Sequence, residues 1–192
     1  MVINMYITML PVIIGGIMNM VFTKTPVYKK LKKPMDGGRN FRDGKRIFGD
    51  NKTWAGFFSM IIFCCISQLS EGIILKISDI DYRNEFYLRH ENMLFYNMII
   101  GILLGAAYMI MELPNSFIKR RIGIPSGKTA QGITGKIFFI IDQIDSLIGV
   151  MLILYFASGI SFAKYMLYIL LGGITHISVN AALYGLKIRK NL

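Results

Sequence analysis

Five uninterrupted apolar stretches, each roughly 20 residues long, constrain this chain more than any other feature of its sequence. A helix of that length crosses the hydrocarbon core of a bilayer, where only helices and closed barrels satisfy all their backbone hydrogen bonds. The stretches are continuous rather than alternating in polarity, which favours helices. The sequence therefore predicts an all-α integral membrane protein with five transmembrane helices, at about residues 3–22, 54–75, 93–113, 137–157 and 165–186.

The basic residues are concentrated in particular loops between these helices. The chain has a formal net charge of +11, and 18 of its 22 Lys and Arg residues lie in residues 23–53, in residues 114–136 and after Leu186. Lys and Arg mark the cytoplasmic side of a membrane protein. We therefore expect two cytoplasmic motif-bearing loops, a cytoplasmic C-terminus and an external N-terminus, in one membrane-embedded domain across residues 1–192. We expect the positive charge to interact with membrane lipids and not with nucleic acid. We expect the external loop, residues 76–92, to be a solvated connector.

The first basic loop interleaves aspartates with lysine, arginine and glycine. Glycine lets the backbone approach a ligand closely. Basic side chains and a hydroxyl group suit phosphate, and aspartates suit a cation that bridges to it. The preceding segment, Lys24–Lys33, lacks such aspartates, and we expect it only to hold anionic headgroups, at about 1 kcal/mol per charge. The loop itself is predicted to bind phosphate, and its candidate residues are Asp43, Arg46, Asp50, Asn51, Lys52 and Thr53.

The second basic loop begins where the third apolar stretch meets Pro114, a residue that does not continue a helix comfortably. Asn115 or Ser116 is a suitable cap for a new short helix. Three basic residues, Lys119–Arg121, then fall within one turn of that helix. Because arginine binds phosphate through two nitrogens at once, this cluster predicts a clamp for a polyphosphate.

The segment Gly123–Thr129 resembles the phosphate-binding loop of ATPases, but its spacing is wrong. Three residues separate Gly123 from Gly127, where the ATPase motif requires four, and no buried strand precedes the segment. We therefore exclude an ATPase and expect a flexible loop that closes over a ligand.

Two carboxylates interrupt the fourth apolar stretch. A single aspartate at the centre of a span costs about 2.5–3.5 kcal/mol to insert. Asp142 and Asp145 are three residues apart, so they share one helix face. No Lys or Arg lies within the apolar cores, so we expect a divalent cation, not a basic side chain, to join the pair. Oxygen ligands beside phosphate favour Mg²⁺. His176, in the last stretch, is expected to be a satisfied polar group, not a ligand.

Together these motifs resemble the CDP-archaeol synthase family, a compact relative of the CDP-diacylglycerol synthases. The resemblance covers about Met35 to Val150 and rests on three separated segments in the same order, Asp43–Gly56, Glu112–Arg121 and Asp142–Asp145. It implies that CMP passes from CTP to a membrane lipid phosphate, with release of pyrophosphate. It further implies that Asp142 and Asp145 hold Mg²⁺ and act with Lys119 and Arg120. The phosphate contacts it implies are the first-loop residues above together with Asn115, Ser116 and Arg121.

Three other functions fit parts of this sequence. A phosphatidate cytidylyltransferase acting on diacyl lipids fits the same motifs. A CDP-alcohol phosphatidyltransferase needs further aspartates on the following helix, and none follows Asp145. A transporter or membrane scaffold explains the apolar stretches and basic loops but not the paired aspartates, and the sequence has no inverted halves of the kind many transporters show. The lipid and the oligomeric state stay open.

The predicted orientation is testable by cysteine labelling in sealed vesicles, in a variant without Cys64 and Cys65. We expect a thiol at Gly38 or Gly132 to be shielded from an external, membrane-impermeant reagent, and one at Asn84 to react. Strong external labelling at Gly132 would reverse the orientation.

Overall fold

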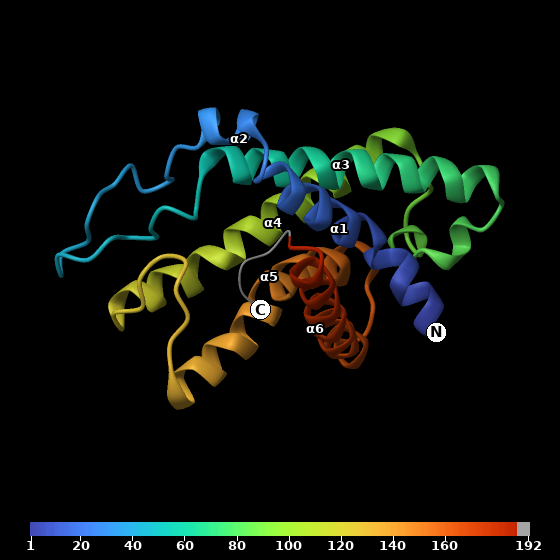
Figure 1. The fold of residues 1–192 in the computed structure, drawn as a ribbon. Coiled ribbons are helices and arrows are strands. Elements are labelled where there is room, and N and C mark those ends of the chain that lie inside the picture. The colour runs from blue at the N-terminus through green and yellow to red at the C-terminus, as the bar shows by residue number, and fades with distance from the viewer. Residues whose placement is uncertain (188–192) are drawn as a thin grey trace.

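The computed structural model describes residues 1–187, and five long helices form its body (Figure 1). All five are long and apolar enough to cross a membrane, which confirms the predicted fold class. A short helix, α2 (Pro26–Leu31), and two 3-10 turns, η1 (Asp81–Arg83) and η2 (Glu85–Tyr87), lie in the loops. The described residues contain no strand, only two isolated bridges. The long helices are α1 (Val2–Phe22), α3 (Trp54–Ile77), α4 (Leu94–Arg121), α5 (Gly132–Ser158) and α6 (Phe162–Gly185).

The loops before α3 and after α4 lie at one end of the bundle, which we call the basic end (Figure 1). It carries the lysines and arginines of residues 23–53 and 114–136. Arg189 and Lys190, part of the predicted cytoplasmic tail, lie outside the described residues.

The closest helix contact joins α3 to α4 through two glycines. A side-chain carbon added at Gly101 would lie 2.5 Å from Cα of Cys65, and one at Gly105 would lie 2.5 Å from Cα of Ile61. Small residues four apart let two membrane helices approach to backbone contact, where dispersion forces and not the hydrophobic effect hold them. This contact fixes α4 against α3.

The helix α4 is longer than predicted, and the expected break at Pro114 is wrong. Pro114 lies inside α4, which continues to Arg121. A proline removes one backbone hydrogen bond, and a membrane helix tolerates this where its neighbours compensate. Its 28 residues span about 42 Å, more than the ~30 Å hydrocarbon core. The last two turns of α4 therefore extend from the span to the basic end, and α5 likewise starts five residues before the predicted Ile137.

The loop between α3 and α4, residues 78–93, is not the solvated connector that we expected. Asn84, Glu85 and Phe86 are buried. The Asn84 amide donates to the Glu71 carboxylate on α3 (3.0 Å), and the backbone N–H of Glu85 donates to the Thr8 hydroxyl on α1 (3.0 Å). Polar groups buried in the loop and helices thus pair with each other, and the loop closes the end of the bundle opposite the basic end. Because Asn84 is buried, the exposed Asp79 is the better labelling position.

The α3–α4 contact predicts the effect of adding a single methyl group. Gly105→Ala forces that methyl against the α3 backbone, and overpacking of this kind costs about 1–3 kcal/mol. We expect a lower melting temperature in detergent. Gly185→Ala, where the added carbon meets nothing within 4 Å, is the matched control and should melt like the wild type.

Candidate functional site

A polar pocket of about 560 Å³ opens at the basic end. It lies between the first basic loop, the last turns of α4, the loop after α4 and the first half of α5. Parts of all three sequence motifs meet there, although they are far apart in the chain. The charged or amide-bearing side chains that line it are Lys24, Asn51, Lys52, Glu112, Asn115, Lys119, Arg120, Lys128, Asp142 and Asp145, together with the hydroxyl residues Ser116, Ser126 and Thr129.

The two aspartates of α5 face α4, where one amide bridges them. Nδ2 of Asn115 donates to Oδ1 of Asp142 and to Oδ2 of Asp145, both at 2.6 Å. The predicted shared face is therefore confirmed. The bridge is available because α4 does not stop at Pro114, so Asn115 is a helical residue and not a cap.

The predicted lack of a basic partner for this pair is wrong. Nζ of Lys119 donates to both oxygens of Asp142. Lys119 follows Asn115 by four residues, so the uninterrupted helix places both side chains on one face. Among the described residues, Asp145 has no ion-pair partner, and the oxygen Oδ1 of Asn115 has no hydrogen-bond partner.

The oxygens gathered here suit a magnesium ion that is completed by its substrate. No group of three His, Cys, Asp or Glu side chains within the described part of the chain is arranged to hold a metal by itself. Mg²⁺, however, is commonly bound by one or two carboxylates, with phosphate oxygens and water in the remaining positions. Two converging carboxylates and an unsatisfied amide oxygen fit that pattern.

Two further cationic side chains, Lys52 and Arg120, line the pocket, and they differ in their bonding partners. Lys52 forms an ion pair with Glu112 of α4, which ties the first basic loop to that helix. Arg120 is 9% exposed and donates from Nε only to the Ser116 carbonyl of its own helix. Its Nη1 is buried without a hydrogen-bond partner in residues 1–187. A buried guanidinium nitrogen without a partner is costly, and an anionic ligand would satisfy it.

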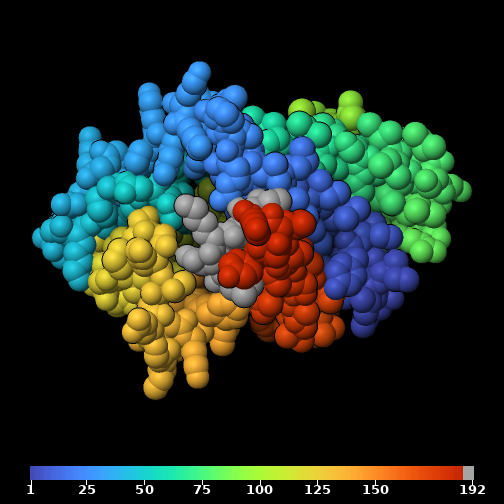
Figure 2. Space-filling model, in the orientation of Figure 1, coloured from blue at the N-terminus to red at the C-terminus, as the bar shows by residue number. Residues whose placement is uncertain are grey.

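Other candidate residues pair with each other outside the pocket lining. Arg121 donates to Oδ1 of Asp43 (2.9 Å), and Arg46 forms an ion pair with Asp50 (2.9 Å). Thr53 caps α3, since its hydroxyl accepts the Gly56 N–H at 3.1 Å. The contacts of Arg121 to Asp43 and to the Arg46 carbonyl hold the first basic loop against the end of α4, and the cyan and yellow surfaces lie side by side in Figure 2.

Sequence reasoning missed several pocket residues. Lys24 was expected only to hold headgroups, yet it lines the pocket at the end of α1. The loop Ser126–Thr129, which was expected to close over a ligand, also lines the pocket, although none of its residues was named as a candidate contact. The Ser126 hydroxyl accepts the Asn51 N–H at 3.3 Å. No pattern in the sequence singled out Glu112 as the partner of Lys52.

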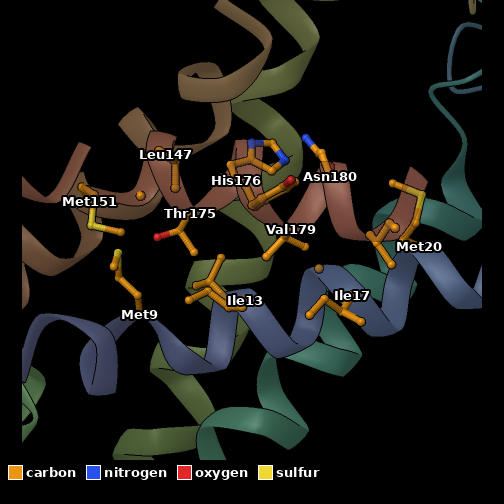
Figure 3. Close-up of a pocket in the computed structure, with 15 residues that line it drawn as sticks. Met9, Ile13, Ile17, Met20, Leu147, Met151, Thr175, His176, Val179 and Asn180 are labelled. Atoms are coloured by element: carbon orange, nitrogen blue, oxygen red, sulfur yellow. The ribbon is translucent and has the colours of Figure 1, made fainter. Parts of the chain in front are cut away.

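An apolar groove between α1 and α6 adjoins the polar pocket (Figure 3). Ile13 and Ile17 of α1 face Val179 of α6 across it, and Met9 of α1 lies opposite Met151 of α5. Three residues line both the groove and the pocket, namely Met20, Tyr108 and His176. His176 lies where the two spaces join, and its Nδ1 is 3.2 Å from the Gln143 carbonyl oxygen.

Comparison with known proteins agrees with this architecture. A solved structure described as an intramembrane enzyme for archaeal membrane lipids biosynthesis superimposes with a TM-score of 0.61, at 20% identity and over 92% of each chain, which supports the shared fold. The CDP-archaeol synthase of Methanococcus aeolicus is 29% identical over 98% of this chain and 95% of its own. That of Staphylothermus marinus is 32% identical over 88% and 85%. The model of the CarS-like family, CDP-archaeol synthase, matches residues 1–191, and the chain belongs to that family.

Proposed function

We propose that the polar pocket and the apolar groove are two arms of one active site, in which CMP passes from CTP to a membrane lipid phosphate. Membership of the CDP-archaeol synthase family supports CTP-dependent formation of a CDP-activated lipid. The observation that carries the proposal is the junction of the two spaces, where Met20, Tyr108 and His176 line both. A polar nucleotide and an apolar lipid need different surroundings, and their reacting phosphates need a common meeting point.

The substrates divide between the two arms by their chemistry. The triphosphate of CTP suits the cations of the pocket, and the buried Nη1 of Arg120 would gain a partner. The lipid tails suit the groove, because it is lined mainly by apolar residues of the membrane-spanning helices, α1 and α6 among them. Lys24, just after the end of α1, lines the polar pocket together with Met20, which also lines the groove, so Lys24 is in position to meet the lipid phosphate.

The reaction is a phosphoryl substitution. An unprotonated oxygen of the lipid phosphate bonds to the α-phosphorus of CTP, so no general base is needed. The bond from that phosphorus to the oxygen bridging to the β-phosphorus breaks, and its electron pair leaves with pyrophosphate. Lys119, Arg120 and Lys128 offset the negative charge of the transferring group in a pocket partly shielded from water.

We propose Mg²⁺ as the cofactor, held by Asp142 and Asp145. When bound, it supplies Lewis-acid stabilisation of the phosphoryl oxygens. Asn115 orients the two carboxylates toward each other, and Lys119 limits their combined charge before the nucleotide arrives. The other predicted phosphate contacts, Asn51, Lys52 and Ser116, stay proposals on the pocket lining.

We also propose that the basic end faces the cytoplasm. The concentration of Lys and Arg in residues 23–53 and 114–136 supports this orientation. The labelling experiment described above tests it.

The two carboxylates of the proposed metal site should respond differently to substitution, because only one of them has a cationic partner in the described residues. Asp145→Asn removes a carboxylate that lies beside Asp142 and has no cationic partner in the described residues, so the metal-free protein should melt at the same temperature or higher. Asp142→Asn deprives Lys119 of its partner and should cost about 1–2 kcal/mol in this half-exposed setting. Both should abolish CMP transfer and the rise in melting temperature that Mg²⁺ and CTP give together.

Stability is measured as melting curves in detergent, with and without Mg²⁺ and CTP. Activity is measured as transfer of labelled CMP to a panel of ether- and ester-linked lipid phosphates. Asp79→Asn, a change of the same kind at an exposed site in the loop 78–93, is the control. Near-normal transfer by Asp145→Asn would contradict the metal site.

The groove predicts a substitution that affects the lipid alone. Gly16 lines the groove, and a side-chain carbon added there meets nothing within 4 Å, so Gly16→Phe directs its ring into the groove from an unobstructed position. We expect the KM for the lipid phosphate to rise about tenfold or more and the KM for CTP to stay unchanged. Ile14→Phe, on the exposed face of the same helix, is the control. An equal rise in both KM values would argue against separate arms.

A further inference from the structure

Asp36 is a fully buried carboxylate to which the sequence patterns assigned no role. Its side chain is 0% exposed, although it lies in the first basic loop, outside the five long helices. The loop is closed at its neck by two backbone hydrogen bonds, from Met35 N to Lys52 O (2.8 Å) and from Trp54 N to Lys33 O (3.0 Å). Asp36 therefore lies next to these two hydrogen bonds, and its side chain contacts residues 46–49 in the second half of the loop.

The carboxylate accepts five hydrogen bonds in this position. Oδ1 accepts from the Gly38 N–H (3.0 Å) and from Nη2 of Arg46 (2.7 Å). Oδ2 accepts from Nε of Arg46 (3.2 Å) and from the backbone N–H groups of Phe48 (3.0 Å) and Gly49 (2.8 Å). Burial by itself would raise the pKa of Asp36, but these donors, Arg46 first among them, hold it well below its usual range. The carboxylate is therefore charged at neutral pH.

The backbone that Asp36 holds leads directly into one wall of the polar pocket. Gly49 has a φ of +96°, which favours glycine, and a side-chain carbon there would lie 2.9 Å from Cβ of Ser126. Two residues on, the Asn51 N–H donates to the Ser126 hydroxyl. Phe48, Asn51 and Lys52 all line the pocket. The position of this wall thus depends on where Asp36 fixes the chain at residues 48 and 49.

We infer that Asp36 is a positioning residue for the nucleotide: it fixes the wall formed by Phe48, Asn51 and Lys52 at the distance from α4 and α5 that a bound triphosphate requires. The inference rests on the proposed function, because it assigns the polar pocket to CTP. Asp36 does not line the pocket and touches neither substrate. Its effect should therefore appear on the nucleotide arm and not on the lipid arm, because none of the described residues that line the groove is hydrogen-bonded to Asp36.

The test is Asp36→Asn, which keeps the size of the side chain. An amide has one acceptor oxygen, and its NH₂ group would face donors in either orientation: Nη2 of Arg46 and the Gly38 N–H, or Nε of Arg46 and the N–H groups of Phe48 and Gly49. We expect the KM for CTP to rise about ten- to hundredfold, with the KM for the lipid phosphate unchanged. The rise in melting temperature given by Mg²⁺ and CTP should shrink in parallel, and this readout does not depend on turnover.

Two further variants keep the inference testable if Asp36→Asn does not fold. Arg46→Lys keeps the charge but loses the forked contact, and Gly49→Ala strains the same backbone without altering Asp36. Both should shift the KM for CTP in the same direction by a smaller factor. Asp79→Asn is again the control and should change neither KM.

Unchanged CTP binding in these variants, or an equal loss for CTP and lipid, would overturn the positioning role. Absence of CMP transfer by the wild-type protein would instead overturn the proposed function. In that case the melting shift with CTP still decides whether Asp36 sets the nucleotide pocket.

Discussion

Two carboxylates inside an otherwise apolar helix need compensation, and the basic end of this protein is built around the way they obtain it. Asp142 and Asp145 would each be costly in a membrane span without a partner. The compensation comes from one neighbouring helix, α4, through Asn115 and Lys119. Since these two residues are four apart, the regular helix from Asn115 to Lys119 places both on the face toward the pair. The carboxylate pair therefore depends on the helical end of α4.

The same helix also organises the first basic loop. Glu112 pairs with Lys52, and Arg121 donates to Asp43 and to the carbonyl groups of Lys45 and Arg46. One rigid element thus determines the spacing between the loop and the carboxylates. A site mounted on a packed helix is held more precisely than one carried by loops alone. The close α3–α4 contact through Gly101 and Gly105 passes this rigidity on to the membrane-spanning body.

The sequence was sufficient for the five helices and for the convergence of Asp142 and Asp145, because hydropathy and helical periodicity act over short distances. It was insufficient where the outcome depended on partners far apart in the chain. Proline propensity favoured a break at Pro114, and packing against other helices overrode it. Composition made residues 76–92 look like a solvated connector, but buried contacts to Glu71 and Thr8 decide its structure.

The same limit applies to the charges of the first basic loop. Residue types suited to phosphate were recognisable, but their division between structural ion pairs and the pocket was not. Asp50 pairs with Arg46, whereas Lys52, two residues on, lines the pocket. Lys24 was set aside because its neighbours lacked aspartate, and only the packing of α1 brings it to the pocket. Spacing in the chain does not encode which of several like charges faces inward.

The packed loop between α3 and α4 has a consequence for the routes by which reactants and products enter and leave the protein. Glu85 pairs with Lys164 at the start of α6 and its backbone N–H bonds to Thr8 of α1, while Asn84 bonds to Glu71 of α3, so this loop joins three helices. Neither the polar pocket nor the apolar groove is lined by residues of this loop. In the proposed reaction, CTP and pyrophosphate would therefore use the basic end, and the lipid would enter from the side. Chemistry of this kind can proceed without opening a leak for ions across the membrane in which it takes place.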